Sequence, residues 1–112
     1  MSCLFCRIVA GEIPATVVHE TERTIAFRDL NPVAPTHVLV ITRDHFADVA
    51  ELADIDPAYL GEVLAAATSV ARQEGLTRGY RLVANTGDDA GQSVHHVHVH
   101  VLGGRSLGWP PG

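Results

Sequence analysis

The chain has 112 residues, of which 46% are hydrophobic, so it is long enough for one domain with its own core. Its formal net charge of −5 without a basic tract argues against a nucleic-acid groove, and the lack of a run of about 18 apolar residues argues against a membrane span. Two cysteines cannot build a disulfide framework, and the N-terminal stretch MSCLFCRIVAGEIPA does not resemble a secretory signal, so we expect a cytoplasmic protein.

The N-terminal half of the sequence predicts a short helix and three strands. The helix is expected over 4–10, where Gly11 would end it. Residues 16–21 and 24–30 are rich in β-branched and apolar side chains, so two strands joined by a hairpin turn are expected there. The proline-containing loop NPVAPTH then leads into a third strand over 37–42.

The C-terminal half predicts the longest helix and two further strands. A short helix is expected over 46–52, and a long one over 56–76, with Asp56 as its N-cap, Pro57 in its first turn and Gly75 at its end. The apolar stripe of the long helix would consist of Leu60, Val63, Leu64, Ala67, Val70 and Ala71. Strands are expected over 80–86 and 94–102. This order of elements is typical of an α+β fold with a five-stranded, mostly antiparallel sheet.

The stretch SVHHVHVHVLGG (93–104) holds four of the seven histidines in the chain. Side chains alternate between the two faces of a strand, so His96, His98 and His100 would share one face. The opposite face, which we interpret as a core face, would carry His95 at its rim, followed by Val97, Val99 and Val101. Three imidazoles in a row are unlike an ordinary solvated strand face, which mixes Thr, Lys, Glu and Ser.

The residues alone leave three uses of this face open. Two of the imidazoles could share a zinc ion, but three could not, because the strand rise separates the outer Cα atoms by about 13 Å. One imidazole could instead attack phosphorus and form a covalent phosphoramidate. The adjacent turn NTGDDAGQS would then offer phosphate oxygens the neutral donors of Asn85, Gln92, Ser93 and its glycine amides. The third alternative is a solvated strand without a chemical role.

The stretch HHVHVHVLGG contains the pattern His-φ-His-φ-His-φ-φ, where φ is hydrophobic, and so resembles the signature of the histidine triad (HIT) superfamily. GEIPATVVHETERTIAFRDLNPVAPTHVLVITRDH is similar to the family's N-terminal half, and GQSVHHVHVHVLGGRSLGWPPG to the C-terminus of its Hint branch, the purine nucleoside phosphoramidases. The resemblance implies a single HIT domain over 1–112, an α+β fold and a homodimer whose sheets join across a two-fold axis. His95 departs from the pattern, because Hint relatives often carry tyrosine there, and we assign it no catalytic role.

The resemblance also implies which residues act on the substrate. His98 would be the nucleophile, His100 and His37 would surround the α-phosphate, and Ser93 would hydrogen-bond near the leaving group. Trp109 would reach the active site of the neighbouring subunit. Purine nucleotide binding is expected at Leu4, Phe5, Ile8, Ile13, Asp29, Leu30, Asn85, Gly91, Gln92, Ser93, Val99 and Trp109.

Cys3 and Cys6 form a Cys-x-x-Cys pair with three interpretations. A thioredoxin-like redox motif would need a βαβ context, which is not predicted here. Two interpretations therefore remain open: the thiols have no shared task, or they form half of a zinc site. The resemblance implies zinc, because many bacterial HIT proteins bind structural zinc through such a pair and two histidines, matched here by His45 and His96. The result would be a closed tetrahedral Cys2His2 site, and the chemistry would need no catalytic metal.

The expected function is therefore hydrolysis of adenosine or other purine 5′-phosphoramidates. The reaction would pass through a covalent nucleotidyl intermediate on His98 and release an amine and then AMP. Two alternatives stay open: a nucleotide-binding regulatory or scaffold protein whose hydrolysis is incidental, and a dinucleoside polyphosphate hydrolase. The ending GGRSLGWPPG favours the Hint branch over the second alternative.

Overall fold

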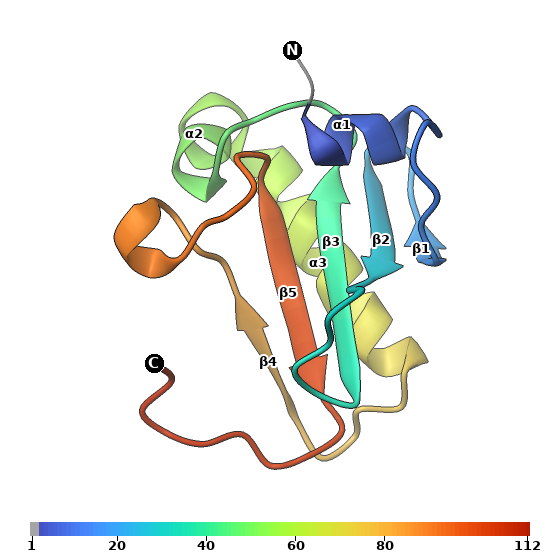
Figure 1. The fold of residues 1–112 in the computed structure, drawn as a ribbon, viewed down its shortest axis with the longest axis vertical. Coiled ribbons are helices and arrows are strands. Elements are labelled where there is room, and N and C mark those ends of the chain that lie inside the picture. The colour runs from blue at the N-terminus through green and yellow to red at the C-terminus, as the bar shows by residue number, and fades with distance from the viewer. Residues whose placement is uncertain (1–2) are drawn as a thin grey trace.

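The computed structural model of the protein describes residues 3–112. Five strands form one sheet in the order β1-β2-β3-β5-β4, and every neighbouring pair is antiparallel (Figure 1). The predicted α+β fold is therefore confirmed. Among the described residues, no helix is both long and apolar enough to span a membrane. In chain order the elements are α1 (Leu4–Val9), β1 (Val17–Glu20), β2 (Thr24–Arg28), β3 (Thr36–Thr42), α2 (Val49–Ile55), α3 (Pro57–Gln73), β4 (Tyr80–Val83), the 3₁₀ helix η1 (Asp88–Ala90) and β5 (His98–Gly103).

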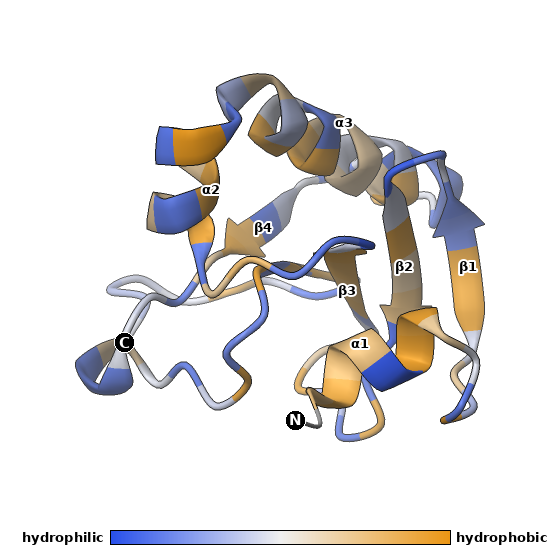
Figure 2. Ribbon diagram, turned by 90° about the horizontal axis from the view of Figure 1, so that it is seen from above, coloured by the Kyte–Doolittle hydropathy of each residue, from blue (hydrophilic) through white to orange (hydrophobic). Residues whose placement is uncertain are grey.

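The two faces of the sheet carry separate hydrophobic cores. Figure 2 shows α3 on one side of the sheet and α1 on the other. Because side chains alternate along a strand, β2 and β3 contribute to both cores, and all 7 residues of β3 are buried. Besides helix residues, the core facing α3 contains Ala26, Val38, Val40, Val97, Val99 and Val101. The smaller core facing α1 contains Phe5, Ile25, Phe27, Leu39 and Ile41.

Pairing between β3 and β5 determines where two of the three triad histidines lie. His98 is opposite Ile41, and His100 is opposite Leu39, so both imidazoles project toward the α1 side of the sheet. The ring of Phe5 on α1 lies edge-on to the ring of His98, with the ring centroids 5.1 Å apart. His98 and His100 thus share one face, as their alternation along the strand predicted, and that face is the one covered by α1.

The strand predicted over 94–102 is wrong in its first half, because β5 begins only at His98. Residues 94–96 form bends, and the Val97 N–H donates to the carbonyl of Phe46 at 2.8 Å, outside the sheet ladder. His96 therefore precedes the strand, where its fully buried ring lies beside the end of β3. The bend separates the environment of His96 from that of the other two triad histidines.

The two helices after β3 differ from their predictions in detail. α2 begins three positions later than predicted, because Asp48 caps it by accepting a hydrogen bond from the Glu51 N–H at 2.9 Å. Asp56 caps α3 as predicted. Within the predicted apolar stripe, Leu64 is 42% exposed, and the buried set is Tyr59, Val63, Ala66, Ala67, Val70 and Ala71. The buried alanines of this set allow α3 to lie close to the sheet.

Candidate catalytic and metal-binding site

A cavity of about 360 Å³ opens between α1, the end of β2 and the histidines of β5. Its walls bring together nine residues predicted to act in catalysis or nucleotide binding: Leu4, Phe5, Ile8, Ile13, Asp29, Leu30, Ser93, His98 and His100. The volume is within the range of small-molecule sites, and one wall is apolar while the other carries imidazoles. A second hollow of about 350 Å³, between the α3–β4 turn and the segment after β5, contains no histidine or cysteine.

The side chain of Gln92 has a different position from the one expected for a phosphate contact. It is 6% exposed and joins its own loop to the segment before α2: Oε1 accepts from the Gly87 N–H at 3.0 Å, and Nε2 donates to the Ala47 carbonyl at 2.7 Å. Gly91, which ends the 3₁₀ helix in a left-handed conformation, also lies outside the cavity walls. Both residues shape the loop that presents Ser93.

Three other residues predicted to bind nucleotide lie away from the cavity of their own chain. The side chain of Val99 packs in the core that faces α3, because its position on β5 alternates with that of His98 and His100. The side chain of Val99 therefore does not line the cavity. Asn85 follows β4 and is half-buried, and Trp109 is 82% exposed, with its ring centroid 6.0 Å from the Arg81 guanidinium carbon.

Sequence reasoning missed part of the cavity wall. Phe27 and Leu39, on β2 and β3, close the cavity beneath α1. Alternation within TIAFR and THVLVIT could have indicated which side chains share a face, but not which face α1 would cover. Other lining residues that were not predicted are Pro14, Ala15, Arg28, Asn31 and Val94.

The tautomer of His98 is set by the backbone. Its Nδ1 lies 2.7 Å from the carbonyl oxygen of His96, which can only accept, so Nδ1 carries the proton. The lone pair of the neutral ring is then on Nε2. The His98 side chain is 8% exposed and lines the cavity.

A second chain of hydrogen bonds sets the tautomers of His37 and His100. The Val33 N–H donates to His37 Nδ1 at 3.1 Å, so the proton of neutral His37 lies on Nε2. That Nε2 is 2.9 Å from His100 Nδ1 and donates to it, which leaves the proton of His100 on its own Nε2. The ring centroids of His98 and His100 are 5.1 Å apart. A nucleophilic nitrogen and an N–H donor are therefore held side by side.

Burial keeps both supporting imidazoles neutral. Burial is the main reason why the pKa of His100 is lowered to about 4. The positive charges of protonated His98 and His37 lower it further, and the carboxylate of Asp29 raises it. Burial also lowers the pKa of His37, although Asp29, with its carboxylate 3.4 Å from His37 Nε2, acts in the opposite direction. The hydrogen bonds from Val33 to His37 and from His37 to His100 require both rings to be neutral, because each ring accepts through Nδ1.

The lowered pKa of His100 predicts a loss of stability in acid. Between about pH 6.5 and about pH 4 the unfolded chain binds a proton that folded His100 does not, so the free energy of unfolding falls as pH decreases through this window. Above it the contribution is complete. We expect the urea midpoint of the wild type to fall more from pH 7 to pH 5 than that of His100→Asn. Equal slopes for the two proteins would contradict this prediction.

Four potential metal ligands gather near Phe5, whose ring also lies edge-on to the ring of His96 with the centroids 5.9 Å apart. The Sγ atoms of Cys3 and Cys6 and the Nδ1 atoms of His45 and His96 all lie within 4.8 Å of one another. Cys6 Sγ is 3.3 Å from His45 Nδ1 and 3.5 Å from His96 Nδ1, and Cys3 Sγ is 3.4 Å from His96 Nδ1. The two Nδ1 atoms are 3.2 Å apart.

These separations fit a tetrahedral metal ion. Bonds of about 2.3 Å to sulfur and about 2.0–2.1 Å to nitrogen would place S and N about 3.5 Å apart and two nitrogens about 3.3 Å apart. The tautomer of His96 fits as well, because its Nε2 lies 2.7 Å from the Thr42 carbonyl oxygen and must carry the proton, which leaves Nδ1 free to bind. The donor set and its geometry therefore suit Zn²⁺.

The similarity of the chain to known proteins agrees with this geometry. It is 50% identical over 111 residues to the "14 kDa zinc-binding protein" of Zea mays, an alignment that covers 97% of this chain and 87% of the relative. It is 44% identical over 111 residues to "Adenylylsulfatase HINT1" of Arabidopsis thaliana, covering 97% and 76%. The crystal structure of a HIT family hydrolase from Legionella pneumophila superposes with a TM-score of 0.95 at 50% identity, covering 99% of this chain and 100% of that one.

A family model describes the same architecture. Residues 10–107, which include β1 to β5 and all three triad histidines, match the model of the HIT domain. The paired histidines on β5, the imidazole of His37 beside them and the fold that brings them together therefore have one common explanation: the chain belongs to the HIT domain family.

Proposed function

We propose that the protein is a Hint-like hydrolase that cleaves adenosine, or other purine, 5′-phosphoramidates. The observation that carries this proposal is the fixed tautomer of His98, which presents the Nε2 lone pair in a cavity of nucleotide size. Attack would form an Nε2–P bond and break the P–N bond, and the leaving amine would take up a proton relayed by Ser93. Water would then form a P–O bond as the Nε2–P bond breaks, and its second proton would return to Ser93 to replace the one relayed to the amine, which releases AMP and regenerates neutral His98.

The neighbouring imidazoles would stabilise the charge on phosphorus. His100 donates through Nε2, and His37 keeps it in that tautomer, so the donor needs no reorganisation as negative charge develops. The apolar wall of Leu4, Phe5 and Ile8 would accept the purine. The name of the Arabidopsis relative, which denotes cleavage of an adenylyl sulfate, supports an adenylyl group as the part of the substrate that is held.

We further propose that the site of Cys3, Cys6, His45 and His96 holds a structural zinc ion. The fit of the four donor atoms supports this, and so does the name of the maize relative. When bound, zinc would supply a cross-link rather than chemistry. His96 would bind it through its side chain, while its carbonyl accepts the proton of His98 Nδ1. Because the ligand thiols must stay reduced, a cytoplasmic location suits the site.

We also propose that the chain forms a homodimer in which the tail of one protomer completes the site of the other. In its own chain the tail is held by the Arg81 guanidinium, which donates to the Gly108 carbonyl at 2.8 Å, but Trp109 remains exposed. An aromatic of this size gains much by burial, since it removes roughly 150–250 Å² from water. A partner subunit is the expected source of that burial.

Deletion of residues 106–112 should change leaving-group preference and largely spare AMP affinity. The base wall and the imidazoles lie outside the deleted segment, whereas Trp109 is within it. Relative kcat/KM values for a panel of AMP amides, measured before and after the deletion, check the first expectation, and calorimetry with AMP checks the second. An unchanged order of preference would contradict a role for the tail.

Heterodimers distinguish a tail that acts in the partner's site from one that acts in its own. When the tail-deleted chain is paired with His98→Ala, the only intact nucleophile faces the complete tail of the inactive partner. Wild-type selectivity should then return. If the selectivity remains that of the deletion, the tail does not act across the interface.

Turnover of AMP amides and dinucleotides tests the proposed function as a whole. We expect the amides to be hydrolysed with a kcat/KM above about 10⁴ M⁻¹ s⁻¹, the lower end of the usual enzyme range. A much lower value with tight AMP binding would favour a regulatory or scaffold role. Preference for dinucleoside polyphosphates would overturn the phosphoramidase assignment.

A further inference from the structure

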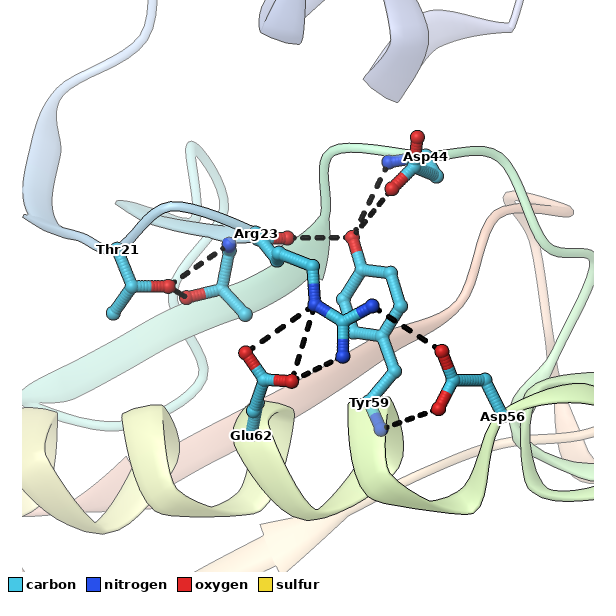
Figure 3. A network of polar contacts seen from close by, with 7 residues as sticks. Thr21, Arg23, Asp44, Asp56, Tyr59 and Glu62 are labelled. Carbon is cyan, nitrogen blue, oxygen red and sulfur yellow. Dashed lines mark hydrogen bonds and ion pairs between the residues drawn. The ribbon is translucent and has the colours of Figure 1, made fainter.

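The hydroxyl of Tyr59 joins three parts of the fold on the side away from the nucleotide cavity. Tyr59 lies in the first turn of α3 and is only 1% exposed. Its hydroxyl is 2.6 Å from the carbonyl oxygen of Arg23, which precedes β2, and 3.0 Å from Asp44 Oδ2, which follows β3 (Figure 3). The Asp44 N–H donates to the same hydroxyl oxygen at 3.4 Å.

The ring of Tyr59 is held from both sides, so the hydroxyl has a fixed position. The Arg23 guanidinium lies 3.8 Å from the ring centroid, and Asp56 and Glu62 at the start of α3 bond that guanidinium (Figure 3). Phe46 packs edge-on to the ring, with the centroids 5.7 Å apart. A phenylalanine at this position would keep these contacts and lose only the hydroxyl.

The segment that the hydroxyl holds carries one of the four potential metal ligands and orients another. Thr42 Oγ1 donates to the Asp44 carbonyl at 2.6 Å, which closes a tight turn at the end of β3. The carbonyl of Thr42 accepts from His96 Nε2 and so leaves His96 Nδ1 free to bind a metal. His45, the other nitrogen ligand, comes directly after this turn. The positions of both nitrogen ligands therefore depend on residues 42–44.

We propose that Tyr59 is a positioning residue for the metal site: through Asp44 its hydroxyl fixes the turn that presents His45 and orients His96. This inference rests on the zinc site proposed above. Neither Tyr59 nor Asp44 contributes a ligand atom to the four-residue group. Groups that orient ligands from outside the coordination sphere change metal affinity by about 10–100-fold when they are removed.

Tyr59→Phe should therefore raise the zinc dissociation constant by about 10–100-fold, measured by competition with a chelator in the full-length protein. Asp44→Asn is the conservative counterpart, since its side-chain amide can still bond the hydroxyl, as an acceptor through its oxygen or as a donor through its nitrogen, and it should retain most of the affinity. Glu62→Gln is a matched control, because it loosens the guanidinium of Arg23 without touching the hydroxyl, and its zinc affinity should equal that of the wild type.

Thermal unfolding with and without zinc separates positioning from general stabilisation. Zinc raises stability in proportion to the logarithm of its concentration over the dissociation constant, so a positioning role predicts a smaller zinc-induced rise in Tm for Tyr59→Phe. An equal rise in wild type and variant, with equal zinc affinity, would overturn the inference and leave Tyr59 as a structural residue. A wild type that binds no zinc would instead overturn the zinc site itself, and the inference with it.

Discussion

Replacing His98 with alanine should lower the turnover of an adenosine 5′-phosphoramidate by roughly 10⁴-fold or more, the scale on which loss of a nucleophile acts. No other imidazole can replace it, because His100 presents an N–H rather than a lone pair, and the ring of His96 faces the cysteines. AMP affinity should change by only a few-fold, since the apolar wall and Asp29 remain. Single-turnover kinetics and calorimetry measure the two quantities.

His95→Ala is the matched control for this variant. It removes an imidazole three positions earlier, but His95 is exposed and lies outside the cavity walls, so activity should be unchanged. Mass spectrometry of wild type quenched during turnover should find the adenylyl group on a peptide at His98. Digestion can separate this site from Ser93 and His96. A label on either of those residues would show that the nucleophile has been misassigned.

Removing one metal ligand should have the largest effect on stability. Protein as purified should hold about one zinc ion per chain, and Cys3→Ser should lose it. Serine can still cap α1, which Cys3 now caps by accepting from the Cys6 N–H at 3.4 Å, so the substitution removes a ligand rather than a helix cap. A loss of about 2 kcal/mol in the free energy of unfolding would lower Tm by roughly 10 °C.

Two comparisons check the metal prediction. Wild type stripped by a chelator should match Cys3→Ser in Tm, and Cys3→Ser should lose less activity per folded molecule than it loses in stability. Metal-free wild type with unchanged Tm would contradict a structural zinc ion. If a chelator abolished activity while Tm stayed the same, the metal would have to act in the reaction itself.

Local patterns predicted those parts of the fold that depend on short-range geometry. Alternation along β5 indicated that His98 and His100 share a face, and the Asp-Pro pair at 56–57 marked the start of α3. The hairpin of β1 and β2 followed from two apolar runs and the turn between them. In each case the signal lies within a few residues, where strand alternation and helix capping act.

Features that depend on contacts between distant segments were not predicted. The bend before β5 accompanies the hydrogen bond from the Val97 N–H to the Phe46 carbonyl. These residues are far apart in the sequence, so no local propensity indicates that they pair. Tyr59 was not assigned to the apolar stripe of α3, because only the fold shows that its hydroxyl bonds Arg23, just before β2, and Asp44, just after β3. The cysteine–histidine cluster could be assigned from family resemblance, but its residues come from three separate regions of the chain.

The metal-ligand group also has a consequence for the order in which the chain folds. Cys3 and His96 are 93 positions apart, so this contact closes nearly the whole chain into a loop. Chains emerge from the ribosome N-terminus first, so both thiols are synthesised well before His96. The 6 residues of α1 are too few to form a stable helix alone. The proposed zinc ion could therefore be fully coordinated only after His96 has been synthesised, which would place metal loading after the synthesis of β1 to β4.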